Sequence, residues 1–330
     1  MLPVKIAGLG HYLPRVCVTS AQLEEKLGLP SGWIERRTGI RERRYASGDE
    51  TALTMAAAAA RMATAAAGLE IGELDLIVGA SSSPHQMIPC TAALVQRELG
   101  MPDGHSACFD VNATCLSFLF ALQTTVHLVA AGVYRNALII SSEVTANSLN
   151  PLEPESAVLM GDAAAAAVIC RTPEDGDSAI WHQKFATFSS GVDFAQVVGC
   201  GTSHHPNDPR TVPHMNTFHM DGPAIFKLAG RKLKPFLHSF LETIDWRPET
   251  IDAVIPHQAS RHGIEFLTSR LGFNSGQVII NLPNRGNCIA ASVPLALAEA
   301  VCQGQVERGD RLLLLATGAG LTLGAIALTF

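Results

Sequence analysis

The feature that most constrains the fold is an internal repeat, because two halves of the chain carry the same order of segments. The paired segments are 73–85 with 250–262, 114–132 with 287–304, 135–143 with 309–318, and 161–170 with 321–330. The first pair shares an acidic residue, a short apolar run and a small polar loop, and the second pair opens with a polar residue and a cysteine before an apolar helical run. The first three pairs keep a similar offset (252 against 75, 288 against 115, 311 against 137), which indicates a duplication.

Within each half, short apolar runs alternate with helical segments such as 51–67 and 223–243. This alternation is typical of a parallel-rich sheet with crossover helices. The runs DLIVGA, NALIISS, DAVIPH and RLLLLAT are continuously apolar, as expected for strands that are buried on both faces. We therefore predict an α/β fold, a five-layer αβαβα sandwich built from two duplicated halves. The charged, turn-rich segment 171–178 places the boundary between residues 1–174 and residues 175–330.

Composition supports a large buried core and excludes several classes of protein. The chain has 330 residues, of which 47% are hydrophobic and 16% are charged. Its net charge of −6 argues against a nucleic-acid-binding protein. The longest uncharged run, 111–134, contains several polar residues, so we expect a buried helix and no membrane span. The N-terminal segment lacks the pattern of a signal peptide.

The eight cysteines are scattered, and no C-x-x-C pair occurs among them. They lie at positions 17, 90, 108, 115, 170, 200, 288 and 302. This distribution argues against a zinc site and against a disulfide framework, and it favours a reducing cytoplasm.

Three polar residues are expected to meet where ligands bind in α/β sheets, outside the carboxyl ends of the strands. Cys115 and Asn287 begin the two repeat-related interior helices, and His257 follows the run DAVIP. A helix N-terminus lowers the pKa of a thiol, which would make Cys115 a nucleophile. Blander interpretations stay open, since Cys115 could be a small buried apolar residue, His257 structural and Asn287 a helix cap.

A fourth feature is the glycine-rich segment ATGAGLTLGAIAL at 316–328. Gly318, Gly320 and Gly324 would let the backbone approach a neighbouring group closely. The backbone N–H of Ala319 could then pair with that of Cys115 to form an oxyanion hole. The alternative is a packing turn between two buried strands.

Taken together, these motifs resemble the β-ketoacyl-ACP synthase III family of the thiolase-fold superfamily, and the resemblance covers nearly the whole chain. The segments that carry it are FDVNATCLSFLFAL, VIPHQAS, NRGNCIAASVPLAL, MGDAAAAAVI, ATGAGLTLGAIALTF, GWIERRTGIRERRYA and MDGPAIFKLA. The resemblance implies that Cys115, His257 and Asn287 are catalytic. It also implies that Trp33 and Arg37 flank a tunnel for CoA or a carrier arm.

The resemblance implies a decarboxylating Claisen condensation. Cys115 would take an acyl group from an acyl-CoA or acyl-ACP, with no metal or redox cofactor. His257 and Asn287 would then stabilise the enolate that forms when a malonyl thioester loses CO2. The expected partners are these thioesters, an acyl carrier protein and a second copy of the chain, whose acyl pocket Ile88 would line. Nucleic acid and membrane are not expected partners.

Several positions depart from the family pattern and leave the acyl donor open. The position five after the histidine, usually arginine, is His262, with Arg261 beside it, and Ser260 stands where asparagine is usual. Ile88 replaces a common aromatic residue, and the loop 199–220 is unusual. A general fatty-acid initiator and a specialised synthase of secondary metabolism are both compatible with these changes.

Basic residues stand out in this acidic chain. Arginines 36, 37, 41, 43 and 44 form one cluster, and Arg231, Lys232 and Lys234 could extend it. They could bind CoA phosphates or an acidic carrier protein, with Arg36 and the three residues at 231–234 as docking candidates. A solvated face paired with Glu35 and Glu42 is the alternative.

Three rival functions remain to be weighed. The order Cys, His, Asn also occurs in papain-like proteases, but the expected sequence around the cysteine is missing and the duplication would be unexplained. Acyl transfer to an alcohol or amine, without decarboxylation, could use the same scaffold. The segment 200–219 could be a metal-binding module through Cys200, His204, His205, His214 and His219, although their spacing fits no tight ligand pattern.

Overall fold

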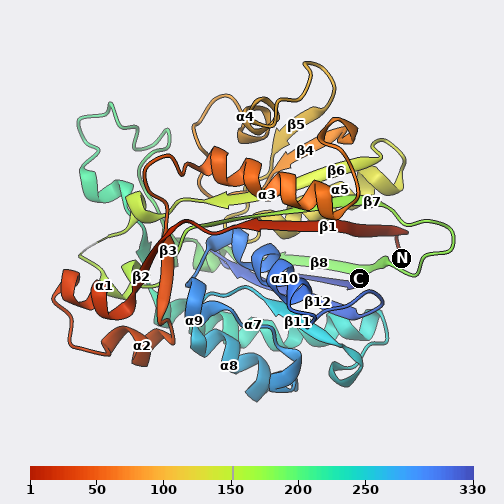
Figure 1. Ribbon diagram of the computed structural model, residues 1–330. Helices are drawn as coiled ribbons and strands as arrows, with labels where there is room; N and C mark the ends of the chain where they lie inside the picture. Colours follow the sequence, from red (N-terminus) through yellow and green to blue (C-terminus); the bar gives the residue numbers. More distant parts are fainter. Residues whose placement is uncertain (151) are drawn as a thin grey trace.

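The computed structural model describes residues 1–150 and 152–330, and its elements form five layers (Figure 1). Two sheets lie face to face, each built largely from one half of the chain. The first sheet has, in spatial order, β1 (Val4–Tyr12), β7 (Ala163–Arg171), β6 (Asn136–Glu143), β4 (Leu76–Gly79) and β5 (Ala107–Asp110). The second has β11 (Ala253–Pro256), β12 (Arg311–Gly318), β13 (Thr322–Thr329) and β8 (Ala179–Thr187).

Helices form the other three layers of the sandwich. The interior pair α5 (Ser117–Ala130) and α10 (Ser292–Cys302) packs between the sheets in one core with both of them. Outside the first sheet lie α3 (Ala52–Ala66) and α4 (Thr91–Glu98), and outside the second lie α7 (Gly222–Thr243) and α8 (Arg261–Arg270). The predicted αβαβα sandwich is confirmed, and so are the two buried interior helices.

The sheets are mixed, so the expectation of parallel-rich sheets is only partly right. In the first sheet, β5, β4 and β6 are parallel, whereas β7 and β1 join antiparallel. In the second, only β11 and β12 are parallel. The reason is that each half ends by folding back on itself, and a chain that reverses beside its own strand must pair antiparallel.

The duplication is visible in the positions of the elements. Landmarks that share one spacing are the strand starts 4 and 179, the helix starts 117 and 292, and the strand starts 136 and 311. The last pair of strands has a shorter spacing because residues 144–162 connect β6 to β7, whereas only residues 319–321 connect β12 to β13. The division into domains at residue 174 stays a prediction.

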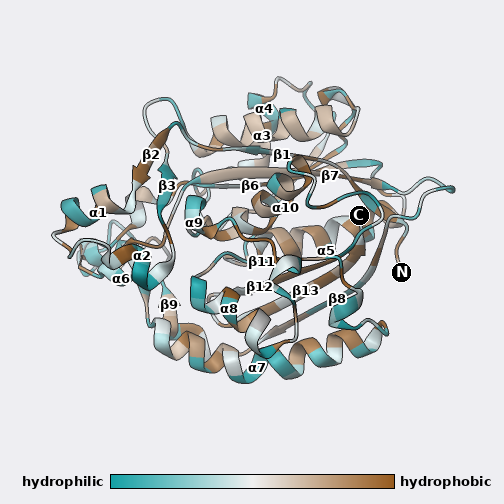
Figure 2. Ribbon diagram, turned by 60° about the horizontal axis from the view of Figure 1, so that its bottom comes forward, coloured by the Kyte–Doolittle hydropathy of each residue, from teal (hydrophilic) through white to brown (hydrophobic). Residues whose placement is uncertain are grey.

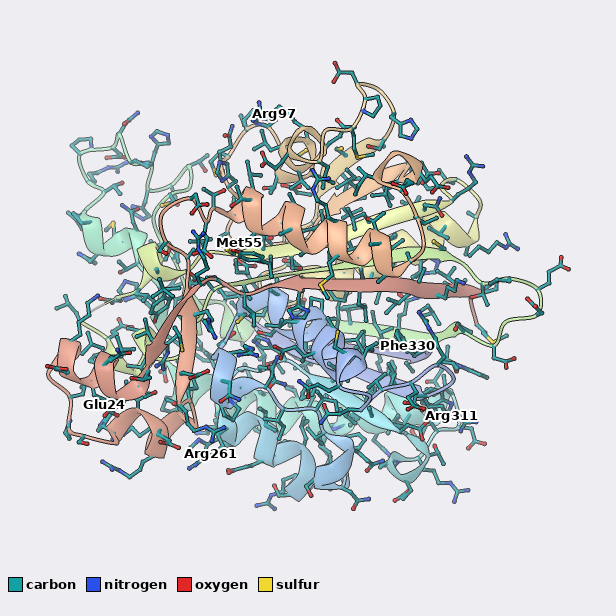
Figure 3. The ribbon with its side chains drawn as sticks, viewed as in Figure 1. Glu24, Met55, Arg97, Arg261, Arg311 and Phe330 are labelled. Carbon is teal, nitrogen blue, oxygen red and sulfur yellow. The ribbon has the colours of Figure 1, made fainter. Side chains whose placement is uncertain are left out.

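The remaining elements cover one end of the sandwich. A flap is made by the hairpin of β2 (Val16–Thr19) and β3 (Glu42–Tyr45) with α1 (Ser20–Leu27) and α2 (Trp33–Thr38). Glu24, only 4% exposed, accepts the N–H groups of Gly32 and Ile34 and so fixes the start of α2. Figure 3 shows Glu24 and Arg261 toward this end of the molecule and Phe330 and Arg311 toward the other.

Shorter elements complete the described chain. They are α6 (Pro154–Ala157), α9 (Leu282–Arg285), β9 (Ala195–Gln196), β10 (His219–Met220) and the 3₁₀ turns η1 (Ile71–Glu73), η2 (Ala146–Ser148), η3 (Ser189–Phe194), η4 (Pro213–Asn216), η5 (Pro248–Thr250), η6 (Ser275–Gln277) and η7 (Ile289–Ala291). Figure 2 shows hydrophobic colouring along α5, α10 and the strands around them. Among the described residues, no helix is both long and apolar enough to cross a bilayer.

Candidate active site

Cys115 lies in a tight turn immediately before α5. The preceding Thr114 has a left-handed backbone (φ 52°), and the helix itself begins at Ser117. The Ser117 hydroxyl accepts the N–H of Ala113 (2.9 Å) and donates to the carbonyl of Thr114 (2.7 Å), which holds the turn in this shape. The cysteine is thus presented on a fixed loop, two residues ahead of the expected helical position.

The second half repeats this turn before α10, with a left-handed residue at Ile289 (φ 48°). The side-chain oxygen of Asn287 accepts the N–H of Ile289 (2.9 Å), just as Asn112 accepts that of Thr114 (3.1 Å). Positions 114 and 289 have the same spacing as the helix starts 117 and 292. The structural counterpart of Cys115 is therefore Ala290, and the sequence pairing of Cys115 with Cys288 is wrong by two residues.

The glycine-rich turn between β12 and β13 packs directly on Cys115. A Cβ on Gly318 would lie 2.5 Å from Leu116, 2.9 Å from the Thr114 hydroxyl and 3.6 Å from the Cys115 Cβ. Only glycine fits this approach without displacing the nucleophile turn. The backbone N–H groups of Cys115 and Ala319 act on the thiol so as to lower its pKa. Two backbone donors therefore lie near the Cys115 thiol.

The Cys115 thiol is protonated at neutral pH, contrary to the expectation of a lowered pKa. Burial, and then the nearby charge of Glu143, raise the pKa of the thiol to about 12, and the two backbone N–H groups offset only part of this increase. The helix was expected to stabilise the thiolate, but desolvation and a buried acid act more strongly. Thiolate formation at this site requires a proton acceptor.

His257 follows β11 and is only 7% exposed. Its backbone N–H donates to the carbonyl of Leu315 on β12 (2.8 Å), which fixes it beside the strand that leads to Gly318. Burial lowers the pKa of the imidazole to about 4, so the ring is neutral at physiological pH. A neutral ring can accept a proton at one nitrogen and donate a hydrogen bond from the other.

Asn287 is held at the junction of the two halves and is also 7% exposed. Its backbone N–H donates to Leu159 (2.8 Å), and its carbonyl accepts from Gly161 (3.1 Å). The fully buried Arg43 packs beside this junction and donates to the carbonyl of Val158 (2.8 Å). Because the side-chain oxygen is already bonded to Ile289, the amide NH2 is the polar group that remains for a ligand.

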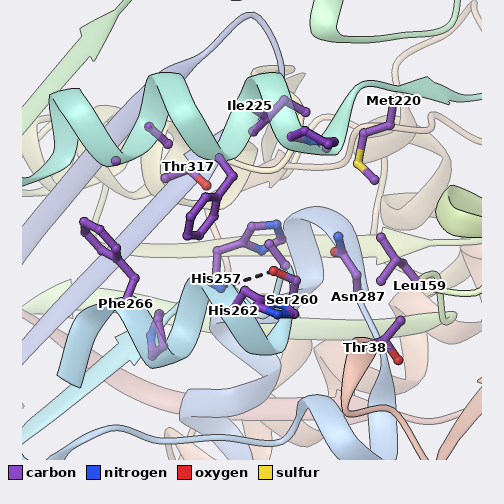
Figure 4. A pocket seen from close by; sticks show the side chains of 18 of the residues that line it. Thr38, Leu159, Met220, Ile225, His257, Ser260, His262, Phe266, Asn287 and Thr317 are labelled. Atoms are coloured by element: carbon purple, nitrogen blue, oxygen red, sulfur yellow. Dashed lines mark hydrogen bonds between the residues drawn. The ribbon is translucent and has the colours of Figure 1, made fainter. Parts of the chain in front are cut away.

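A cavity of about 500 Å³ brings His257 and Asn287 together (Figure 4). His257, Asn287 and Ser260 line it, as do Trp33 and Arg37. In Figure 4, Phe266 lies at one end of the cavity, and Leu159 and Thr38 lie at the other. Cys115 is not among the described lining residues. It lies behind them at the end of β12, a strand whose residue Thr317 also lines the cavity.

The cavity carries one basic side chain from the predicted tunnel entrance. The Arg37 guanidinium stacks over Trp33 at 4.7 Å from the ring centroid and forms a 2.7 Å ion pair with Glu155. All three residues line the cavity. An anionic ligand at Arg37 would compete with Glu155, a residue that sequence reasoning did not select.

The other predicted basic residues lie outside the described cavity lining. Arg261 donates to the backbone carbonyl of Arg36 (3.1 Å), so these two are adjacent near α2. Lys232 places its amine 5.1 Å from the Phe188 ring centroid, while Arg231 and Lys234 are exposed on α7.

Ile88 lies on the loop 81–90, with 84% of its surface exposed, and its neighbour Met87 is 77% exposed. A second cavity, of about 160 Å³, lies beside this loop. Met87 and Asn112 line it, together with Asp110. Because Asn112 is the repeat counterpart of Asn287, the two cavities lie at equivalent places in the two halves.

The loop 199–220 does not gather the residues of the proposed metal-binding module. The His219 ring pairs with Glu153 (2.5 Å), and Cys200 contacts Asn216 (3.3 Å). Among the described residues, no three His, Cys, Asp or Glu side chains lie close enough to hold a metal ion. The loop instead ends at Met220, which lines the main cavity.

Sequence reasoning missed the apolar wall of the cavity and the buried acid whose charge acts on Cys115. The wall comes from α7 and α8 and includes Ile225, Phe226, Leu233 and Phe266. The acid is Glu143, which ends β6 and is fully buried. A single acid at the end of the apolar run NALIISSE is a signal that could have identified it.

Two family models match the chain. Residues 109–189 match the model of 3-oxoacyl-[acyl-carrier-protein (ACP)] synthase III, and residues 241–330 match its C-terminal model. The first match contains the Cys115 turn, and the second contains His257, Asn287 and the glycine-rich turn.

Whole-chain relatives point to the same family. The chain is 36% identical over 329 residues to a beta-ketoacyl-[acyl-carrier-protein] synthase III from Neisseria meningitidis serogroup C, which covers 99% of both chains. It is 37% identical over 325 residues to the enzyme of the same name from Clostridium perfringens, which covers 98% of both. Its fold is similar to the crystal structure of 3-oxoacyl-[acyl-carrier-protein] synthase III from Aquifex aeolicus, with a TM-score of 0.89, 35% identity and coverage of 99% and 100%.

Proposed function

The chain belongs to the β-ketoacyl-ACP synthase III family, and from this premise we propose the roles of its residues in the reaction. The chain is a condensing acyltransferase, which joins an acyl thioester to a malonyl thioester. The rival protease, metal-binding and non-decarboxylating functions are not favoured. The observation that carries the proposal is the buried pair His257 and Asn287 in one cavity, with the Cys115 turn behind it.

In the first step, Cys115 attacks the carbonyl of an acyl thioester. Its proton passes to the neutral His257 ring, a carbon–sulfur bond forms, and the N–H groups of Cys115 and Ala319 hold the oxyanion. The thiol pKa of about 12 and the imidazole pKa of about 4 make a free ion pair unfavourable in the empty site. Proton transfer is therefore concerted with attack. The leaving thiolate takes the proton from His257.

In the second step, a malonyl thioester occupies the cavity and loses CO2. Electrons of the broken carbon–carbon bond move to the thioester oxygen, which accepts hydrogen bonds from His257 and from the amide of Asn287. The resulting carbanion attacks the acyl group on Cys115. The cysteine leaves as a thiolate and regains a proton from water. The electrons for the new carbon–carbon bond come from the bond to the departing CO2.

The thioester substrates enter past the Trp33, Arg37 and Glu155 side chains. Arg37 is suited to a phosphate of CoA or of a phosphopantetheine arm, in competition with Glu155. Arg36 with Arg261 and Arg231 with Lys232 and Lys234 are candidate docking surfaces for an acidic carrier protein. The eight cysteines are unpaired, which supports a reducing compartment, and we propose the cytoplasm.

Exposure of the purified enzyme to a panel of acyl-CoAs tests the proposed donor class. We expect one acyl group to be retained on the peptide that contains Cys115, because acyl transfer to this thiol is the first step. Intact-mass and peptide-mass analysis measure it for short, long and branched donors. Retention on a peptide without Cys115, such as the one with exposed Cys302, would contradict the assignment of the nucleophile.

We also predict that the active form is a homodimer in which Ile88 covers the partner's acyl pocket. The exposed pair Met87 and Ile88 supports this, since contiguous exposed apolar side chains mark association surfaces. Ile88→Glu should weaken the dimer in sedimentation at micromolar concentration. Val133→Glu, at another exposed apolar position, is the matched control and should not. A wild-type monomer under these conditions would refute the prediction.

A further inference from the structure

Glu143 is a buried carboxylate whose oxygens accept three hydrogen bonds. It ends β6 and has no exposed surface. One oxygen accepts the N–H of Ser82 (2.6 Å), and the other accepts the N–H (3.2 Å) and the hydroxyl (2.6 Å) of Ser83. The backbone N–H of Ala290 acts to lower the pKa of this carboxyl, against the effect of burial. Such a set of donors compensates a buried charge and fixes the side chain in one position.

These contacts join three parts of the site that are far apart in sequence. Ser82 and Ser83 begin the loop 81–90, which carries Met87 beside the second cavity. Ala290 lies in the turn after Asn287 and is the repeat counterpart of Cys115. The charge of Glu143 also acts on the Cys115 thiol itself. One side chain thus contacts or influences the nucleophile, the Asn287 turn and the loop.

We propose that Glu143 is a positioning residue for the nucleophile, which holds the loop 81–90 at the end of β6, beside the Ala290 turn, and places a negative charge near Cys115. The inference rests on the proposed function only in taking Cys115 as the nucleophile. The tether holds the wall of the second cavity in place. The charge opposes formation of the thiolate in the empty site. Cys115 therefore loses its proton only when it attacks the carbonyl carbon of a bound substrate.

A raised thiol pKa affects both the nucleophilicity of the thiolate and the sensitivity of the resting thiol to damage. A thiolate of higher pKa is intrinsically more nucleophilic once it forms, and a resting thiol is less prone to alkylation and oxidation. Burial raises the pKa of Glu143 itself to about 7, so the negative charge is present above this pH. The charge of Glu143 also contributes to the raised pKa of the Cys288 thiol. The titratable residue His85, on the loop 81–90, is exposed to solvent.

The chain offers a matched control in Asp162, next to β7. This carboxylate is also buried (1% exposed) and accepts the N–H of Ala46 (2.9 Å) and the N–H and hydroxyl of Thr145 (2.7 and 2.8 Å). Like Glu143, it is a buried carboxylate that accepts three hydrogen bonds from segments distant in sequence. Its charge acts on Cys288, whereas the one acid that acts on Cys115 among the described residues is Glu143.

The test measures the rate of Cys115 alkylation by iodoacetamide against pH in the full-length protein. Glu143→Gln should move the midpoint to lower pH by about one unit or more, because a buried like charge is removed. Alkylation below the midpoint should be roughly tenfold faster than in the wild type. Asp162→Asn should leave the midpoint unchanged. An unshifted midpoint in folded Glu143→Gln would overturn the proposal.

Hydrogen exchange tests the tether, including the case in which Glu143→Gln does not fold. Glu143→Asp keeps the charge but withdraws the carboxylate, so the amides of Ser82 and Ser83 should exchange faster than in the wild type. Unchanged exchange of these amides would also overturn the proposal. Iodoacetamide and exchange need no substrate, so both results are independent of condensation. A wild-type Cys115 that accepts no acyl group would instead count against the proposed function.

Discussion

Replacement of Cys115 by alanine is expected to abolish formation of the acyl-enzyme and to reduce condensation to background. The side chain is the proposed nucleophile of the first step, and its Cβ lies beside the Gly318 turn. The fold should survive, because the Thr114 turn is held by Ser117 and alanine occupies less space than cysteine. Intact-mass analysis after exposure to acyl-CoA measures the effect.

Cys288→Ala is the matched control for this change. Cys288 is buried, whereas Cys115 is partly exposed, and desolvation raises the pKa of both thiols. It follows Asn287 in the repeat-related turn but, by structural position, is not the counterpart of the nucleophile. Cys288→Ala should therefore retain the acyl group. Acylation that persists in Cys115→Ala and disappears in Cys288→Ala would reverse the assignment.

Asn287→Ala is expected to separate the two halves of the reaction. Acylation depends on Cys115, His257 and the backbone donors, so acyl-Cys115 should still accumulate. Decarboxylation loses one of two side-chain donors to the enolate oxygen, which typically costs about 10²–10³ in rate. The measurement is CO2 release from labelled malonyl thioester.

His257→Ala should impair both steps, which distinguishes it from Asn287→Ala. The thiol pKa of about 12 means that thiolate formation requires an acceptor, and His257 is the neutral base in the cavity. This corrects the simpler expectation that the helix N-terminus alone would ionise Cys115. The ring must also donate to the enolate in the second step.

Much of the fold could be predicted because the hydrophobic pattern and the internal duplication can both be recognised in the amino-acid sequence. Continuous apolar runs identified buried strands, and the repeat placed two helices in the interior. Strand direction was partly missed. β7 pairs antiparallel with β6, and β13 pairs antiparallel with β12, because the chain reverses direction between the two strands of each pair. The repeat alignment at Cys115 was displaced by two residues because the shared feature is a left-handed turn, which residue types alone do not reveal.

The sequence predicted the polar residues of the candidate site, but it did not predict the apolar residues and the buried acid that surround them. Cysteine, histidine and asparagine after strands are conspicuous, and His257 and Asn287 indeed face one cavity. The apolar wall from α7 and α8 looks like any amphipathic helix in sequence, since which face borders a cavity is set by packing. The protonation state of Cys115 depends on burial and on Glu143, which is distant in sequence.

The most direct test of the account measures acyl-Cys115 and CO2 together in wild type and Asn287→Ala, with acyl-CoA and labelled malonyl thioester supplied to both. The account predicts that the wild type forms both acyl-enzyme and CO2, with a β-ketoacyl product. Asn287→Ala should form acyl-enzyme while its CO2 release falls by about 10²–10³. Wild-type CO2 release in Asn287→Ala would contradict the proposed mechanism, as would a wild-type enzyme that passes its acyl group to an alcohol or amine without releasing CO2.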